Sequence, residues 1–228
     1  MRSVRLEPTV LDFCQTMRVD IDPPADGPCN MGKDLILLAL AESGEPGARI
    51  YTWDGPWLSL GCFQRPSDVT VELGNLPWVL RPTGGKAVRH GADLTVSIAL
   101  PLKRLGLESR QVKGAYRAVA NPLIEGLRAA GIRATLAEGT KWCNPAGKQS
   151  RTTDCFAHNS PNDIVDEVSG AKVCGCALRV TETAVLLQAS IPLVGTDPLV
   201  LARAIRPYLL ELGAAAQTRM DCADPAAL

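Results

Sequence analysis

The chain has 228 residues, of which 46% are hydrophobic and 21% charged, a balance typical of a globular protein with a sizeable core. Its 24 basic and 24 acidic residues cancel, which argues against a nucleic-acid-binding protein that works by bulk charge. No stretch approaches the roughly 20 apolar residues that span a bilayer, and residues 1–20 lack the apolar core of a signal peptide. We therefore expect a cytoplasmic protein without a membrane or nucleic-acid partner, whose eight cysteines are thiols rather than disulfides.

The first half of the chain predicts one helix and four strands. Prolines crowd the first ~28 residues, which we expect to be irregular. Asn30 is a capping residue before an apolar stretch that stops at Gly44, so a well-buried helix is predicted between them. Apolar and β-branched runs bounded by turn residues then predict strands at 48–53, 57–63, 77–82 and 93–100.

The second half predicts two helices and a meander of strands. Residues 108–131 have helical spacing, with Pro122 splitting the helix and Asn121 capping its second piece. Another helix is expected over 197–213, interrupted at Pro207 or starting late there, and the tail after it is expected to fray. The remaining apolar runs predict strands at 132–138, 162–168, 171–180 and 184–193.

Partly segregated helices and strands, with strands joined by short turns, indicate an α+β fold with a largely antiparallel or mixed sheet and flanking helices. No repeat, linker or low-complexity segment divides the chain. Residues 1–228 are therefore expected to form a single domain.

The stretch RPTGGKAVRH, from Arg81 to His90, places a Gly84-Gly85 turn among three cations and a histidine, directly before a predicted strand. Two adjacent glycines let the backbone approach a ligand closely, and exposed amides there can bind an anion or a carbonyl. The spacing fits neither a P-loop nor a dinucleotide-binding fingerprint. From composition alone, a ligand-binding loop and an ordinary glycine turn both remain open.

Two further segments carry reactive side chains. Cys155 lies among polar residues near His158, where a neighbouring cation would make the thiol a nucleophile; the alternative is a small buried thiol. Lys172, Cys174 and Cys176 are expected to face the same way on their strand, and a desolvated Lys172 would stabilise a developing oxyanion. The alternative is a solvated lysine at the start of a strand. No metal is expected, because the chain has no CxxC pair and only two histidines.

Six stretches together resemble the lipoate–protein ligase and octanoyltransferase family, within the biotin/lipoyl protein ligase superfamily. RPTGGKAVRHGADLTVS is similar to the family signature Arg-Arg-x-Thr/Ser-Gly-Gly-x-Ala-Val-x-His, which leads into a strand that ends in serine. The resemblance runs in order from Asn30 to Leu193. The other stretches that carry it are CNMGKDLILL, IYTWDGPWLSLGCFQRPSDV, DCFAHNSPNDIV, GAKVCGCALRV and LLQASIPL.

The resemblance implies a biotin/lipoyl protein ligase-like fold and a tunnel for an eight-carbon acyl chain, lined by the Gly-Gly loop. It implies that Lys172 is the catalytic lysine and that the carboxyl end of the acyl group lies near the lysine strand. By the same resemblance, the residues implied in substrate binding are Arg81, Thr83, Gly84, Gly85, His90 and Gly175.

The sequence departs from the family pattern at four positions. Gly32 stands where alanine is usual, Leu35 where an acid is usual, Leu80 where the signature has its first arginine, and Gly91 where aspartate is common. None of these removes the lysine or the glycines. They leave open how an adenylate or a carrier protein is contacted.

The family resemblance leaves two chemistries, and we expect the transferase. Cys155 matches the nucleophile of the cysteine-dependent octanoyltransferases, which take the acyl group from octanoyl acyl carrier protein and need no cofactor. The lysine of a lipoyl domain, as in the glycine cleavage H protein or dehydrogenase E2 subunits, would accept it. About 35 residues follow Leu193, too few for the accessory domain of many ligases. The first alternative is a ligase that uses ATP and Mg²⁺ to form lipoyl-adenylate. The second is a non-catalytic lipoyl-binding relative.

Overall fold

The computed structural model describes residues 17–69, 75–143 and 159–223, with side chains up to residue 215 in the last helix. Cys155 and His158 lie outside the described residues. A seven-stranded mixed sheet forms the centre of the molecule, and only its first pair of strands is parallel. In spatial order its strands are β1 (Arg18–Ile21), β2 (Gly47–Tyr51), β6 (Asp93–Pro101), β10 (Ala184–Pro192), β9 (Lys172–Val180), β8 (Ile164–Asp166) and β7 (Ala134–Leu136).

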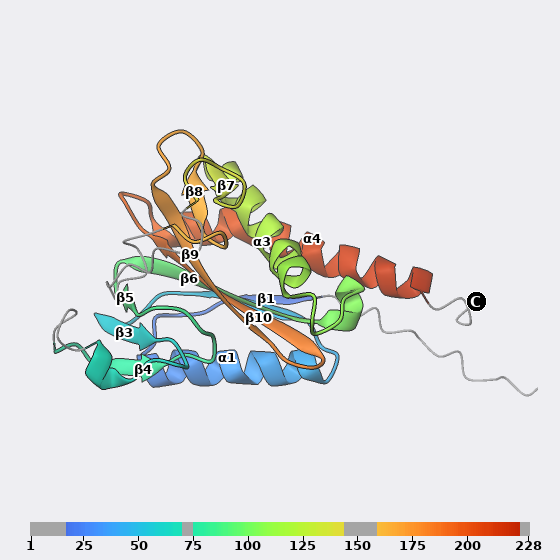
Figure 1. Ribbon diagram of the computed structural model, residues 1–228, viewed down its shortest axis with the longest axis horizontal. Helices are drawn as coiled ribbons and strands as arrows, with labels where there is room; N and C mark the ends of the chain where they lie inside the picture. The colour runs from blue at the N-terminus through green and yellow to red at the C-terminus, as the bar shows by residue number, and fades with distance from the viewer. Residues whose placement is uncertain (1–16, 70–74, 144–158, 224–228) are drawn as a thin grey trace, which may run out of the picture.

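A second, three-stranded sheet lies beside α1 (Gly27–Glu42) on one side of the large sheet (Figure 1). Its central strand pairs in parallel with one neighbour and antiparallel with the other. The loop between its two outer strands contains the glycine pair. Its strands, in spatial order, are β4 (Trp78–Leu80), β3 (Trp57–Leu60) and β5 (Val88–His90).

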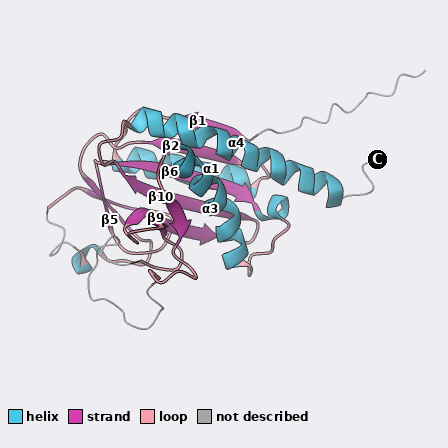
Figure 2. Ribbon diagram, turned by 90° about the horizontal axis from the view of Figure 1, so that it is seen from above, coloured by secondary structure: helices cyan, strands magenta, loops and turns pink. Residues whose placement is uncertain are grey.

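Helices cover both faces of the large sheet. α3 (Val112–Ala129) and α4 (Pro198–Ala223) pack side by side on one face, and α1 lies on the other (Figures 1 and 2). Two short 3₁₀ turns, η1 (Pro66–Asp68) and η2 (Leu102–Leu105), complete the described elements. None of the described helices is long and apolar enough to cross a membrane.

The two faces of β10 follow the period-2 alternation of a strand and carry different chemistry. Val185, Leu187 and Ala189 enter the main apolar core with the side chains of α3 and α4. On the opposite face, Gln188 and Ser190 are buried polar residues that point toward the side of α1. The large sheet therefore separates the main apolar core from a face that combines these polar residues with a smaller apolar cluster, formed by Leu37, Leu38, Ala41, Ala99, Ala184 and Leu186.

The structure confirms the α+β class but corrects the predicted start of the first helix. α1 begins at Gly27 and is capped by the Asp26 carboxylate, which accepts from the amide of Cys29 at 2.8 Å. Asn30 is fully buried inside the helix, where its side-chain amide donates to the carbonyl of Ala25. β1 lies within the segment predicted to be irregular, because four residues paired with β2 are too short to leave a strong pattern.

The two helices with an internal proline are more continuous than the sequence predicts, and the second of them is also longer. α3 passes through Pro122 without a break, and α4 passes through Pro207 and past Gly213 to Ala223. A proline inside a helix costs ~3 kcal/mol. In α3 that cost is offset because side chains on both sides of Pro122, such as Val119 and Leu123, are completely buried in the main core.

Candidate functional site

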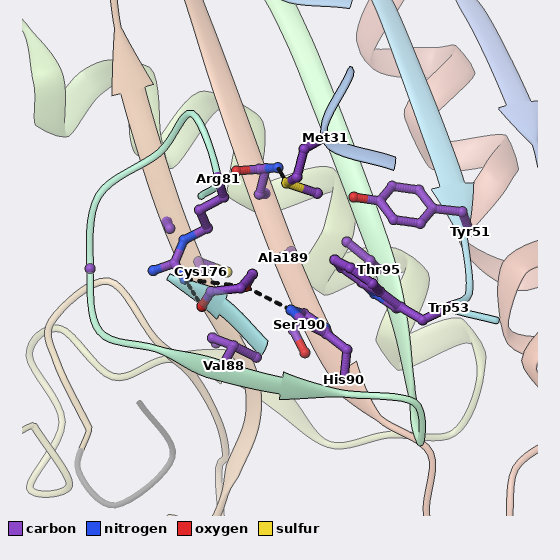
Figure 3. Close-up of a pocket in the computed structure, with 15 residues that line it drawn as sticks. Met31, Tyr51, Trp53, Arg81, Val88, His90, Thr95, Cys176, Ala189 and Ser190 are labelled. Carbon is purple, nitrogen blue, oxygen red and sulfur yellow. Dashed lines mark hydrogen bonds between the residues drawn. The ribbon is translucent and has the colours of Figure 1, made fainter. Parts of the chain in front are cut away.

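A cavity lies between the large sheet, α1 and the three-stranded sheet, and it contains four of the predicted substrate-binding residues (Figure 3). The volume within which the centre of a water-sized molecule fits is about 40 Å³. Met31, Val88 and Ala177 give it an apolar wall, and Ser59 and Thr95 add hydroxyl groups. The predicted residues that line it are Arg81, Gly85, His90 and Gly175.

Arg81 organises the glycine loop from within. Its guanidinium donates to the carbonyl of Gly84 at 2.6 Å, to that of Lys86 at 2.8 Å and to that of Ser59 at 3.0 Å. The side chain is buried among these backbone acceptors. The fixed fork of donors on arginine suits several acceptors at once, so Arg81 ties the loop to the neighbouring strand β3.

The two glycines of the loop have different roles. Gly85 has φ +95°, a conformation that L side chains rarely adopt, and a Cβ there would lie 2.9 Å from Nη2 of Arg81. Gly84 does not line the cavity, and a Cβ there would meet only the ring of Phe63 at an ordinary 3.8 Å. At the end of β3, a Cβ on Gly61 would collide with the backbone carbonyl of Gly85. The loop thus packs backbone against backbone.

His90 lies at the end of the cavity beside Trp53 (Figure 3), and its ring has three neighbours. Its Nδ1 lies 2.8 Å from Oδ2 of Asp93, its Nε2 lies 2.7 Å from Oγ of Ser59, and its ring stacks on Trp53 at 4.0 Å. Burial pushes the pKa of Asp93 upward, but hydrogen bonds from His90 and Ser190 outweigh it and hold that pKa below its ordinary value. The ionised carboxylate can only accept, so in the neutral ring Nδ1 carries the proton.

Thr83 connects the loop to a buried carboxylate in α1. Its hydroxyl donates to Oε1 of Gln188 at 2.6 Å, and the amide of Gln188 donates to Asp34 at 2.6 Å. Asp34 is completely buried and also binds Arg49 and Tyr51. Burial raises the pKa of Asp34 above its ordinary value, against the opposing effect of Arg49. Thr83 therefore positions the loop and does not itself line the cavity.

Lys172 is a buried, paired lysine at the start of β9. Its ammonium lies 2.8 Å from Oδ2 of Asp163, and the two side chains are 4% and 3% exposed. The lysine is therefore not the solvated strand-start residue that composition alone would favour. Lys172 does not line the cavity, but Gly175 and Ala177 on the same strand do.

A register shift corrects the predicted facing of Lys172. Ile164 pairs with Cys174, so a regular ladder would pair Val165 with Val173, but Val165 pairs with Lys172 instead. Because paired residues share a face of the sheet, this β-bulge removes Lys172 from the face of Cys174. The bulge places it on the face of Val165, opposite that of Ile164.

Cys174 and Cys176 lie on the other face, toward α3, and Cys176 also lines the cavity. Their sulfur atoms are 3.7 Å apart, and both residues pack into the main apolar core with Tyr116. Burial raises the pKa of the Cys174 thiol well above its ordinary value. A thiol in that state is a poor nucleophile, so Cys174 is a weak competitor for an acyl group.

Sequence reasoning missed the residues that hold the site together. Gln188 and Ser190 occupy ordinary positions of an alternating strand, and Asp34 lies in a helix that was predicted to be well buried but was given no role. Asp163 was part of a quoted motif but was given no role. A polar residue on the side of a strand or helix expected to be buried is the signal that would have identified the first three. Among the described residues, no group of three or more potential ligands forms a metal site.

Comparison with known proteins now identifies the family. The lipoyl protein ligase A/B catalytic domain matches residues 28–211. The chain belongs to this family. It is 32% identical over 183 residues to Octanoyltransferase LipM of Kyrpidia tusciae, covering 78% of this chain and 65% of that protein. It is 35% identical over 167 residues to Octanoyltransferase LipM of Staphylococcus aureus, covering 70% and 59%. The chain thus matches somewhat less than two thirds of these relatives' length.

The fold is shared with solved lipoate–protein ligases. The structure of lipoate-protein ligase A bound with ATP has a TM-score of 0.61 and 19% identity, covering 87% of this chain and 84% of that one. A bi-partite lipoate protein ligase from Thermoplasma acidophilum has a TM-score of 0.58 and 17% identity, covering 89% and 84%. At these identities the likeness extends to the fold, which confirms the biotin/lipoyl protein ligase-like architecture.

Proposed function

We propose that this protein is an octanoyltransferase that moves an eight-carbon acyl group from acyl carrier protein to the lysine of a lipoyl domain. The observation that carries the proposal is the set of octanoyltransferase relatives at 32–36% identity, which cover most of this chain. The cavity supports it, because an apolar wall closed by a glycine loop suits an aliphatic chain. Acceptors would be the glycine cleavage H protein or dehydrogenase E2 subunits.

Cys155 is the proposed nucleophile. Its thiolate attacks the thioester carbonyl of the donor, a carbon–sulfur bond forms to the enzyme, and the carrier leaves as a thiolate that takes up a proton. The amine of the acceptor lysine then attacks the acyl-enzyme, loses a proton and releases the Cys155 thiolate. One thioester replaces another in the first step, so neither ATP nor Mg²⁺ is needed.

Lys172 is the proposed charge-stabilising group. In each step a negative charge develops on the carbonyl oxygen, and a fixed ammonium group lowers the energy of that state. A buried lysine with a carboxylate partner supports this role better than a solvated one, since it is already oriented.

The test is octanoylation of a purified lipoyl domain by the parent and by Cys155→Ser, each with octanoyl carrier protein alone or with octanoate, ATP and Mg²⁺. The parent should act without ATP and form a hydroxylamine-sensitive adduct at Cys155, and Cys155→Ser should do neither. Cys62→Ser, which removes an exposed thiol outside the cavity, is the matched control. Full ATP-dependent activity in Cys155→Ser would show that the protein is a ligase and not a transferase. The absence of acylation under every condition would show that it is a non-catalytic relative.

A further inference from the structure

We propose that Asp163 is a positioning residue that holds the ammonium group of Lys172 in place for acyl transfer. The inference rests on the proposed role of Lys172. The ion pair that carries it lies at a 2.8 Å separation, with both side chains almost completely withdrawn from solvent.

The backbone around Asp163 is fixed by neighbours from three directions. The carbonyl of Asp163 accepts from the amide of Ala137 at 2.9 Å, and its own amide donates to the carbonyl of Ser160 at 3.0 Å. The hydroxyl of Tyr116, from α3, donates to the carbonyl of the preceding residue, Asn162. Asp163 thus lies on a segment whose backbone is fixed by hydrogen bonds. A residue that orients another side chain needs such a fixed backbone.

The side chain of Asp163 has two tasks. Its Oδ2 accepts from the amide of Ser160 at 2.6 Å and pairs with Lys172. The first contact closes a local turn and fixes the carboxylate. The second then fixes the lysine, whose four-carbon stem is otherwise flexible.

The β-bulge makes this pairing possible. In a regular ladder Lys172 would face the core with Cys174, and a lysine there would meet apolar side chains. The shift puts it on the face of Val165, and by period-2 alternation Asp163 belongs to that same face. The bulge and the carboxylate together deliver the charged group to the side of the sheet that carries the cavity.

Two described groups near the pair are neutral. Tyr116 from α3 and Cys174 from β9 lie close enough to influence it. Burial raises the pKa of Tyr116 and of Cys174, so both stay protonated. Neither supplies a negative charge to the ammonium group, whereas the Asp163 carboxylate lies 2.8 Å from it.

The competing interpretation is that the ion pair only stabilises the fold. A structural role would lower the amount of folded enzyme equally at every pH. A positioning role lowers kcat per folded molecule and leaves KM for the carrier protein nearly constant. The two interpretations therefore differ in a readout other than overall activity.

The experiment compares the parent with Asp163→Asn and Asp163→Glu. For Asp163→Asn we expect kcat to fall by about 10²-fold, the effect of a small misplacement of a catalytic group. Asp163→Glu keeps the charge but lengthens the side chain, and it should show a smaller loss of kcat. Glu138→Gln breaks an exposed carboxylate pair with Arg117 and serves as the matched control with parental kinetics.

A second readout does not need acyl transfer. Competitive acetylation with acetic anhydride across a pH series, read by mass spectrometry at each lysine, should label Lys172 faster at a given pH in Asp163→Asn than in the parent. Identical labelling in the two proteins overturns the proposal, even if octanoyl transfer is confirmed. Faster labelling without any octanoyl transfer by the parent would uphold the lysine–carboxylate coupling and refute the proposed function. Should Asp163→Asn not fold, a kcat of Asp163→Glu equal to that of the parent overturns the proposal, because the longer side chain displaces the carboxylate.

Discussion

The two faces of the seven-stranded sheet bury side chains of different kinds. The face toward α3 and α4 buries aliphatic side chains such as Leu187 and Leu123, whose contribution depends on area and close packing. The face toward α1 buries carboxylates, among them Asp34 and Asp93, each with several hydrogen-bond partners.

This difference separates stability from function within a single sheet. Buried polar groups contribute little net stability and are costly when a partner is lost. On the α1 face they fix the glycine loop through Thr83 and the ring of His90 through Asp93. Substitutions of these polar residues should therefore change the geometry of the site as well as stability, and substitutions in the main apolar core should change stability alone.

The largest expected effect is that of Lys172→Ala. Removing a charge-stabilising group lowers the rate of acyl transfer by about 10²–10³-fold. Circular dichroism should show that the fold forms, with a lower melting temperature because Asp163 loses its counter-charge. A folded variant with nearly parental turnover would remove Lys172 from the mechanism.

The next largest effect is the difference between substitutions at the two glycines of the loop. Gly85→Val should weaken binding of an octanoyl ligand by about 10- to 100-fold, because its Cβ would crowd Arg81 and overpacking costs about 1–3 kcal/mol. Gly84→Val should have a much smaller effect, since its Cβ points toward the exposed ring of Phe63. Titration calorimetry with an octanoyl thioester measures both. Equal losses for the two variants would mean that the cavity is not the acyl site.

A third variant changes only the packing of α3 against α4. A Cβ on Gly126 would lie 2.8 Å from the Cα of Ile205, where α3 and α4 approach most closely, so Gly126→Ala should lower the unfolding free energy by about 1–3 kcal/mol. A Cβ on Gly114, on the same helix, would meet the movable side chain of Leu107 at 3.3 Å and Cβ of Gln111 at 4.0 Å, so Gly114→Ala should be neutral or stabilising. Urea unfolding measures this, and the activity per folded molecule should stay constant. A loss of activity at constant stability would contradict the separation of the two faces.

Local patterns were enough to predict the order of elements and the glycine loop. Strands such as β6 and β10 combine period-2 alternation with flanking turn residues, so their positions follow from local sequence. Arg81, Gly85 and His90 were identified through the family resemblance, and they do lie together at one cavity.

The rest depends on contacts between distant segments. The pairing of Asp163 with Lys172 follows from a β-bulge, and a single extra residue in one strand leaves no trace in an alternation pattern. The network from Thr83 through Gln188 to Asp34 joins residues more than 100 positions apart. The predicted break at Pro122 was wrong for the same reason, because tertiary burial of α3 outweighs the local cost of proline.

The smallest expected effect is a change in the acid dependence of stability, which tests Asp93 on the polar face. Its pKa is lowered in the folded protein from 3.8, so the folded state holds fewer protons than the unfolded chain below that pH. The stability that Asp93 contributes is thus complete above about pH 4 and lost as the pH falls through the folded pKa. Asp93→Asn should be less stable at neutral pH, yet lose less of its remaining stability between about pH 4 and pH 2, by at most one proton or ~1.4 kcal/mol per pH unit. Asp34 has the opposite shift, because burial raises its pKa, so Asp34→Asn should steepen the acid limb in the same series of urea titrations. Parallel acid limbs for the parent and both variants would mean that neither carboxylate is held in the ionisation state that its hydrogen bonds require.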